Sequence, residues 1–328
     1  MSPDPRPPDE DRERPAGAEA ARRPPLVSVV MPFLDPPVSF FREAIESVLA
    51  QTLSEWELLL VNDGSGPEAS RFAEEAAARD PDRIRVLAHP GRENRGVPAA
   101  RNLGIAFAAS ELIAFLDADD LWLPERLEHH LELLRAHGDA AMAYGPSLYW
   151  RSWHAPKAED VTPPTHVPAG VVMNPIGLLA HLLRGAGAVP CPTSVTCRTR
   201  ALREVGGFIE GFPVPTEDQA FYVRFLLAHP AVVTDRTLDR YRLHPDSATG
   251  SAEPDEEASW RRVLLAWALD EAGRHAPEAT GLHRVIRDEL RLLDRPLEAR
   301  LRRTGRRLVR RLGLERSPHL VPLASSQG

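Results

Sequence analysis

The sequence predicts an α/β protein whose open, mostly parallel central sheet carries helices on both faces. Between residues 26 and 149, short apolar runs alternate with segments in which apolar residues recur at helical spacing, and this alternation is typical of such sheets. Two of the apolar runs continue directly into acidic turns, at 62–65 and 117–120. Because open parallel sheets bind ligands at the carboxyl ends of their strands, these two turns indicate where a binding site lies.

The elements of the first half follow in order. The apolar run at 26–32 ends in proline and predicts a buried strand, residues 39–51 place apolar side chains on one helical face, and residues 56–61 predict a second strand. Further strands are expected at 84–87, 112–116 and 141–149, and further helices at 72–79, 98–109 and 124–137.

The second half is less regular. Residues 151–190 are rich in proline, and we expect them to belong to an insertion or to an acceptor-side region. The remaining expected elements are helices at 176–183, 199–205 and 217–228, a strand at 193–198, a break at 206–208, and helical structure over 256–312.

The net charge of −7 is unevenly distributed over the 328 residues. Residues 1–25 are proline-rich, carry −1 and cannot bury enough apolar surface to fold, whereas residues 284–316 carry +7. The remaining residues 26–283 therefore carry −13, which disfavours nonspecific nucleic-acid binding, so no nucleic-acid partner is expected. No apolar stretch approaches the ~20 residues that span a bilayer, and we expect a cytoplasmic protein.

The strongest local pattern is the turn Asp117-Ala118-Asp119-Asp120, which follows a predicted buried strand. Three neighbouring carboxylates are costly unless a cation neutralises them, and hard oxygen ligands favour Mg²⁺ or Mn²⁺. One interpretation is a divalent metal that holds a diphosphate. The other is an acidic turn that caps the helix beginning near Pro124, and spacing alone does not decide between them.

Weaker patterns supply further candidates, each with an ordinary structural alternative. Asp63 is either an acceptor for a base or sugar or a common turn residue. Arg101 lies in a helix start suited to phosphate, or is a surface arginine. The pair Glu217 and Asp218 either includes a general base or caps a helix. His244 is a metal or phosphate ligand, or a structural histidine.

In their order and spacing, these segments resemble the family 2 glycosyltransferases, enzymes of the GT-A fold that use nucleotide-diphosphate sugars. The resemblance is carried by residues 27–32, 42–52, 62–65, 100–104 and 115–120 in the nucleotide-binding half, and by 206–208, 217–218 and 241–245 in the acceptor half. It implies a GT-A domain at 26–251. A disordered tail at 1–25 would precede it, and an arginine-rich helical extension at 252–316 and a flexible tail at 317–328 would follow.

The resemblance also implies roles for individual residues. Asp119 would bind a Mn²⁺ or Mg²⁺ ion that bridges the diphosphate, and Asp117 would contact the ribose or the metal. His244 would be a further metal or phosphate contact. Asp218 would be the catalytic base, supported by Glu217. The residues expected to bind the nucleotide sugar are Pro32, Leu34, Asp35, Asp63, Arg101, Asp117 and Ala118.

Two positions depart from the family pattern. Leu34-Asp35 stands where the family has an aromatic residue followed by asparagine, and Asn62-Asp63 stands where it has paired acids. The processive-synthase signature Q-x-x-R-W and membrane spans are missing. Synthesis of cellulose-like or hyaluronan-like chains is therefore not expected.

The expected reaction transfers a sugar, with inversion, from a nucleotide-diphosphate sugar to a saccharide, lipid-linked or small-molecule acceptor. One alternative is a nucleotidyltransferase of related fold, which would carry a glycine-rich basic loop that residues 32–37 do not provide. Another is a non-catalytic module that binds sugar nucleotides or membranes.

The arginine-rich end has two interpretations of its own. Leucines at 297, 301, 308 and 312 follow helical spacing among arginines, which suits an amphipathic helix at an anionic membrane surface. Residues 295–316 would then attach the protein peripherally to the inner face of the membrane. The alternative is a solvated helix folded onto the acidic body.

Overall fold

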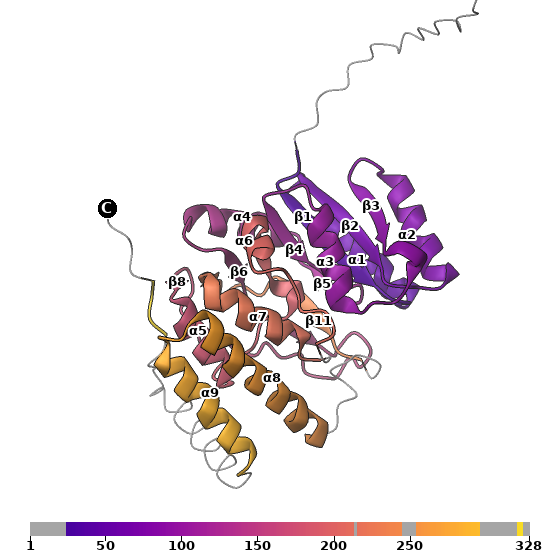
Figure 1. Cartoon of the computed structure of the whole chain (residues 1–328). Helices are drawn as coiled ribbons and strands as arrows, with labels where there is room; N and C mark the ends of the chain where they lie inside the picture. Colours follow the sequence, from indigo (N-terminus) through magenta and orange to yellow (C-terminus); the bar gives the residue numbers. More distant parts are fainter. Residues whose placement is uncertain (1–23, 213–214, 245–253, 296–319, 324–328) are drawn as a thin grey trace, which may run out of the picture.

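The computed structural model describes residues 24–212, 215–244, 254–295 and 320–323 (Figure 1). Within these ranges the chain forms an α/β fold with a large central sheet and helices on both faces, which confirms the expected class. Three expected segments lie mostly or wholly outside the described residues: the tail at 1–25 apart from residues 24 and 25, the arginine-rich segment at 295–316 apart from residue 295, and the tail at 317–328 apart from residues 320–323.

The main sheet is mostly parallel. Within the described ranges it has eight strands, in the order β3 (Ile84–Ala88), β2 (Trp56–Asn62), β1 (Val27–Phe33), β4 (Leu112–Phe115), β9 (Thr196–Arg198), β6 (Met142–Tyr144), β10 (Ala231–Val233) and β8 (Val172–Met173). The first four strands in this order pair in parallel. Strand β9 runs antiparallel between β4 and β6, and β8 runs antiparallel to β10.

A smaller sheet follows the acidic turn at 117–120. It consists of β5 (Leu121–Trp122), β11 (Asp239–Arg242) and β7 (Leu148–Trp150), with β11 in the middle. The single strand expected at 141–149 was therefore wrong, because β6 and β7 belong to different sheets. The chain passes between them at Gly145, where a Cβ would lie 2.8 Å from both Thr234 Cγ2 and the Arg236 carbonyl oxygen.

Helices cover both faces of the main sheet. One face carries α1 (Val38–Leu49), α2 (Pro67–Arg79) and α4 (Arg126–Ala136). The other carries α3 (Val97–Phe107), α5 (Pro175–Leu183), α6 (Thr199–Glu204), α7 (Glu217–Ala228), α8 (Pro254–His275) and α9 (Thr280–Leu293). The helical region expected from residue 256 is broken between α8 and α9, where Pro277 lies.

Strand β1 contributes side chains to both layers of the core, because its side chains alternate between the two faces of the sheet. Val30 packs in the cluster beneath α3 and α7, whereas Val29 and Met31 pack in the cluster beneath α1 and α2. No helix among the described residues is long and apolar enough to cross a membrane.

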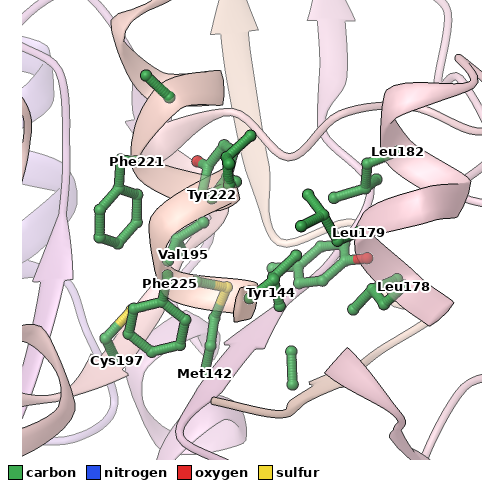
Figure 2. Close-up of a cluster of buried hydrophobic side chains, with 14 of the residues drawn as sticks. Met142, Tyr144, Leu178, Leu179, Leu182, Val195, Cys197, Phe221, Tyr222 and Phe225 are labelled. Atoms are coloured by element: carbon green, nitrogen blue, oxygen red, sulfur yellow. The ribbon is translucent and has the colours of Figure 1, made fainter. Parts of the chain in front are cut away.

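Helix α7 is anchored deep in the core. Phe221, Tyr222 and Phe225 are at most 2% exposed, and they pack with side chains of α5 and of strands β6 and β9 (Figure 2). Because the body of the helix is fixed in this way, the carboxylates of its first turn are held in place.

Candidate functional site

A cleft of about 720 Å³ opens at the carboxyl ends of β1, β2 and β4. The first turn of α7 and residues of β7 and β11 form the rest of its wall. The cleft brings together every residue that the sequence singled out as a site residue, namely Pro32, Leu34, Asp35, Asp63, Arg101, Asp117, Ala118, Asp119, Glu217, Asp218 and His244.

Arg101 connects the two halves of the cleft. Its side chain is 3% exposed, its Nη2 donates to Asp117 Oδ1 at 2.7 Å, and its Nη1 lies 3.9 Å from Glu217 Oε1. Burial alone would lower the pKa of this guanidinium, but the carboxylates of Asp117, Glu217 and Asp218 outweigh it and leave the pKa raised. Arg101 therefore stays charged and ties the acidic turn to α7.

Asp218 lies at the start of α7 beside a second acid. Burial, followed by the negative charge of Glu217, raises the pKa of Asp218 to about 7. Its Oδ1 accepts a hydrogen bond from the Gln219 backbone N–H at 2.6 Å, which opposes this shift. Burial also raises the pKa of Glu217, against the effect of Arg101. With a pKa of about 7, the Asp218 carboxyl group can take up and release a proton near neutral pH.

The segment 206–208 lies behind Arg101 and not in the cleft. The Phe208 N–H donates to Asn102 Oδ1 at 2.8 Å, and Asn102 Nδ2 donates to the Phe208 carbonyl oxygen at 2.9 Å. The Phe208 ring centroid lies 5.1 Å from the Arg101 guanidinium carbon. Gly207 has a φ of +69°, and a Cβ there would overlap the Asn102 side chain. This motif thus supports the position of Arg101.

Asp119 and His244 form the second polar cluster. Asp119 Oδ2 and His244 Nε2 are 3.0 Å apart, and the two side chains are 33% and 13% exposed. This contact is a hydrogen bond, and because a carboxylate oxygen and an imidazole nitrogen are both ligands that Mn²⁺ accepts, the pair could supply two ligands to a divalent ion. The described residues hold no group of three or more metal-ligating side chains. Any further ligands would come from Asp117, from water or from a substrate, as is usual for Mg²⁺ bound with phosphates.

Arg242 and Asp120 hold the acidic turn in position. Sequence reasoning gave Arg242 no role and counted Asp120 among three carboxylates that a cation could neutralise, but Asp120 does not line the cleft. Asp120 is fully buried and accepts from Thr193 Oγ1 at 2.7 Å and from the Arg242 N–H at 2.8 Å. Arg242 Nε donates to the Asp119 carbonyl oxygen at 2.7 Å, and its Nη2 pairs with Glu43 of α1. The guanidinium stacks within about 5 Å of three rings, those of Phe40, Trp150 and Trp153. The only sequence signal for Arg242 is its place two residues before His244.

The opposite wall is formed by the ends of β1 and β2. Asp63 is 2% exposed, and its Oδ1 accepts from the Arg95 N–H at 2.9 Å. Asp35 has a φ of +44°, and its Oδ1 accepts from the Gly66 N–H, so this carboxylate fixes the start of α2. Leu34 beside it is 47% exposed at the rim of the cleft.

Comparison with known sequences agrees with this geometry. The model of the family described as Glycosyl transferase family 2 matches residues 28–202, more than half of the chain. An uncharacterized glycosyltransferase of Rickettsia felis is 28% identical over 230 residues, which cover 69% of this chain and 35% of the relative. Another, from Nostoc sp., is 34% identical over 127 residues, which cover 33% of this chain and 38% of the relative. The chain spans between 13% and 41% of the length of eight curated relatives.

Solved structures show the same fold. S. aureus TarS 1–349 in complex with UDP-GlcNAc superposes with a TM-score of 0.62 at 18% identity, over 80% of this chain and 71% of that one. The mannosyltransferase PcManGT of Pyrobaculum calidifontis, in complex with GDP-Man and Mn²⁺, superposes with a TM-score of 0.55 at 16% identity, over 91% and 85% of the two chains. The fold is therefore of the GT-A type. Together with the match over residues 28–202, this shows that the chain belongs to glycosyl transferase family 2.

Proposed function

We propose that the chain transfers a sugar from a nucleotide-diphosphate sugar to an acceptor hydroxyl, with inversion at the anomeric carbon and with Asp218 as the general base. One observation carries the proposal: Asp218 lines the cleft within electrostatic reach of Asp117, and its pKa is raised to about 7. A general base works best when its pKa lies near the operating pH. Similar folds were solved with UDP-GlcNAc and with GDP-Man, which supports a nucleotide-sugar donor.

In the proposed step, the acceptor hydroxyl gives its proton to the Asp218 carboxylate while its oxygen forms a bond to the anomeric carbon. The bond between that carbon and the diphosphate oxygen breaks, and its electron pair leaves with the nucleoside diphosphate. A single in-line displacement inverts the configuration. Glu217 contributes indirectly, because its negative charge raises the pKa of Asp218 and makes that carboxylate a stronger base.

The leaving group would be stabilised on the opposite side of the cleft. Asp119 and His244 would hold Mn²⁺ or Mg²⁺, and the ion, when bound, would neutralise charge on the diphosphate. Arg101 adds a fixed positive charge, since its Nη1 and Nε have no hydrogen-bond partner among the described residues. Asp117 uses Oδ1 for Arg101, and we assign its other oxygen to the ribose or to the metal.

The base is assigned to the wall formed by β1 and β2. Asp63 uses Oδ1 for the Arg95 N–H, and we assign Oδ2 to the edge of the base. Pro32 and Leu34 would contact the base through apolar surface. Asp35 would shape the loop through its bond to Gly66, and Ala118 leaves room for the sugar nucleotide beside the acidic turn.

The function is tested by incubating the protein with a panel of UDP- and GDP-sugars and Mn²⁺. Donor binding is read from the melting temperature, which rises because a ligand of the folded state stabilises it, and turnover is read as released nucleoside diphosphate. We expect at least one donor to bind and to be consumed, and chelation of Mn²⁺ by EDTA to weaken both readouts. The proposal is wrong if no donor raises the melting temperature or releases nucleoside diphosphate. A non-catalytic module would bind a donor without consuming it.

Attachment to an anionic membrane through residues 295–316 remains a proposal, supported by the arginine content of this segment. The test compares the full chain with a chain ending at Asp294 in pelleting with anionic liposomes at low salt. Full-length protein that stays in the supernatant would contradict it.

A further inference from the structure

Two tyrosines lie side by side on the wall of the cleft. Tyr149 of β7 and Tyr241 of β11 are direct partners in the parallel ladder, their ring centroids are 5.4 Å apart, and both line the cleft. Side chains alternate across a strand, so Trp150 and Arg242, which stack on each other, point to the opposite face of the small sheet. One face of this sheet therefore braces the acidic turn, and the other gives an aromatic surface to the cleft.

This tyrosine pair lies next to the proposed general base. Burial raises the pKa of Tyr149, and the neighbouring Cys191 and then the charge of Asp218 add to the shift. This places the Asp218 carboxylate within electrostatic reach of the ring. Trp260 of α8 lines the same cleft and adds a third aromatic side chain.

The charges around the cleft disfavour an anionic acceptor. Both arginines that line the cleft in the described part of the chain are already paired with a carboxylate. Arg101 pairs with Asp117, and His244 contacts Asp119. Arg261 donates to the Leu183 carbonyl oxygen at 2.6 Å and pairs with Glu289 at 3.3 Å.

The carboxylates of Glu217 and Asp218 face the same space. A phosphorylated acceptor would meet these two negative charges without an available cation, because the proposed metal ion and the positive charge of Arg101 are both assigned to the diphosphate of the donor.

We propose that the acceptor is an uncharged saccharide, and that one of its sugar rings lies on the Tyr149–Tyr241 pair with a hydroxyl directed at Asp218. This inference rests on the proposed glycosyl transfer and names its acceptor class. The carbon–hydrogen face of a sugar ring matches the flat apolar surface of a tyrosine, while the phenol hydroxyls suit its polar edge.

The first experiment measures which acceptors the full-length protein uses. It is carried out with Mn²⁺ and with the nucleotide sugar that the protein consumes in the donor screen. The acceptors are methyl glycosides and neutral disaccharides, and each is compared with its phosphorylated form. We expect neutral saccharides to increase release of nucleoside diphosphate and to be recovered as glycosylated products. We expect phosphorylated forms to react at least tenfold more slowly.

The second experiment tests the platform itself. Tyr241→Ala should raise the KM for the acceptor by roughly tenfold, the loss expected when one aromatic contact is removed, and should leave the KM for the donor unchanged. Tyr241→Phe keeps the ring and should stay within about twofold of wild type. Tyr241→Leu keeps apolar volume without the ring and replaces the alanine variant if that one does not fold. Phe107→Ala, which removes a ring that is 53% exposed and does not line the cleft, is the matched control.

The outcomes separate the two levels of inference. A protein that binds and consumes no donor overturns the proposed function and this inference with it. A protein that consumes donor but prefers phosphorylated acceptors, or glycosylates no uncharged saccharide, overturns only the acceptor class. Equal acceptor KM values for wild type, Tyr241→Ala and Tyr241→Leu overturn the platform.

Discussion

Replacing Asp218 with asparagine removes the proposed proton acceptor while keeping the shape of the side chain. The amide oxygen can still accept the Gln219 N–H that Asp218 Oδ1 accepts at 2.6 Å, so the start of α7 is preserved. Because a positioned general base contributes about 10²- to 10⁴-fold, we expect kcat to fall by about that factor. Titration calorimetry of the donor should give a Kd within about twofold of wild type, because Asp218 is assigned to the acceptor side.

The pH dependence follows from the raised pKa of Asp218, which is about 7 through burial and the charge of Glu217. The carboxylate is the active form, so activity is present above this pKa and is lost as the pH falls through it. At pH 5 about 1% of the base form remains, and kcat/KM should fall about tenfold per pH unit below 7. Asp218→Asn should lack this acidic limb.

Stability changes in the opposite direction. The folded-state pKa of Asp218, about 7, lies above its unfolded value of about 3.9. The stability contributed by this group is therefore full below pH 4 and is lost as the pH rises through 7. Above pH 7, Asp218→Asn should melt no lower than wild type. Loss of activity in a variant that melts normally cannot then be assigned to unfolding.

Glu217→Gln is the matched control, because it removes the neighbouring charge and keeps the base. The charge of Glu217 is the second largest cause of the raised pKa of Asp218, so the acidic limb should move to lower pH. The reasoning is refuted if Asp218→Asn turns over at the wild-type rate, or if its kcat/KM keeps the same acidic limb.

Three further perturbations test other parts of the fold and site. Asp119→Asn and His244→Ala should each weaken Mn²⁺-dependent donor binding at least tenfold and leave Mn²⁺-independent binding unchanged. Calorimetry of donor binding with and without the ion measures both quantities. Equal losses of affinity in the two conditions would contradict a metal role. Arg242→Lys keeps the positive charge but loses the Nε hydrogen bond to the acidic turn and the planar stacking on the aromatic rings. Urea unfolding should therefore show that the free energy of unfolding falls by about 3 kcal/mol. A fall below about 1 kcal/mol would contradict the bracing role. Gly104→Ala drives a Cβ into a buried β1 side chain and should cost about 1–3 kcal/mol by urea unfolding, whereas Gly138→Ala, with nothing within 4 Å, should cost much less. Similar losses in the two glycine variants would refute the packing argument.

The order of elements in the first half could be predicted from local patterns. Apolar runs and helical spacing placed β1, β2, β4 and helices α1, α3 and α4 close to their observed bounds. The errors arose where long-range packing overrides the local pattern. One apolar run from residue 141 was divided between two sheets. The chain crosses between them at Gly145, where neighbouring atoms leave no room for a Cβ.

The membership of the site was also predictable, for a topological reason. Strands β1, β2 and β4 are parallel neighbours, so the turns after them meet at one edge of the sheet wherever their sequences carry polar residues. Motif order then added the residues of α7 and His244. All of these side chains line one cleft.

Local periodicity and the order of short motifs were sufficient to predict the fold class, the family resemblance and many of the polar side chains that gather in the cleft. How those side chains are paired and charged follows from contacts that form only in the folded chain. The contact between Arg101 and Asp117 and the aromatic stack around Arg242 each join segments that are separated in the chain. The pKa of Asp218 is raised chiefly by burial, which depends on the packing around α7. The alignment of Tyr149 with Tyr241 depends on the register of two short strands. Burial and register arise from packing across the whole domain, and no local pattern of residues specifies them.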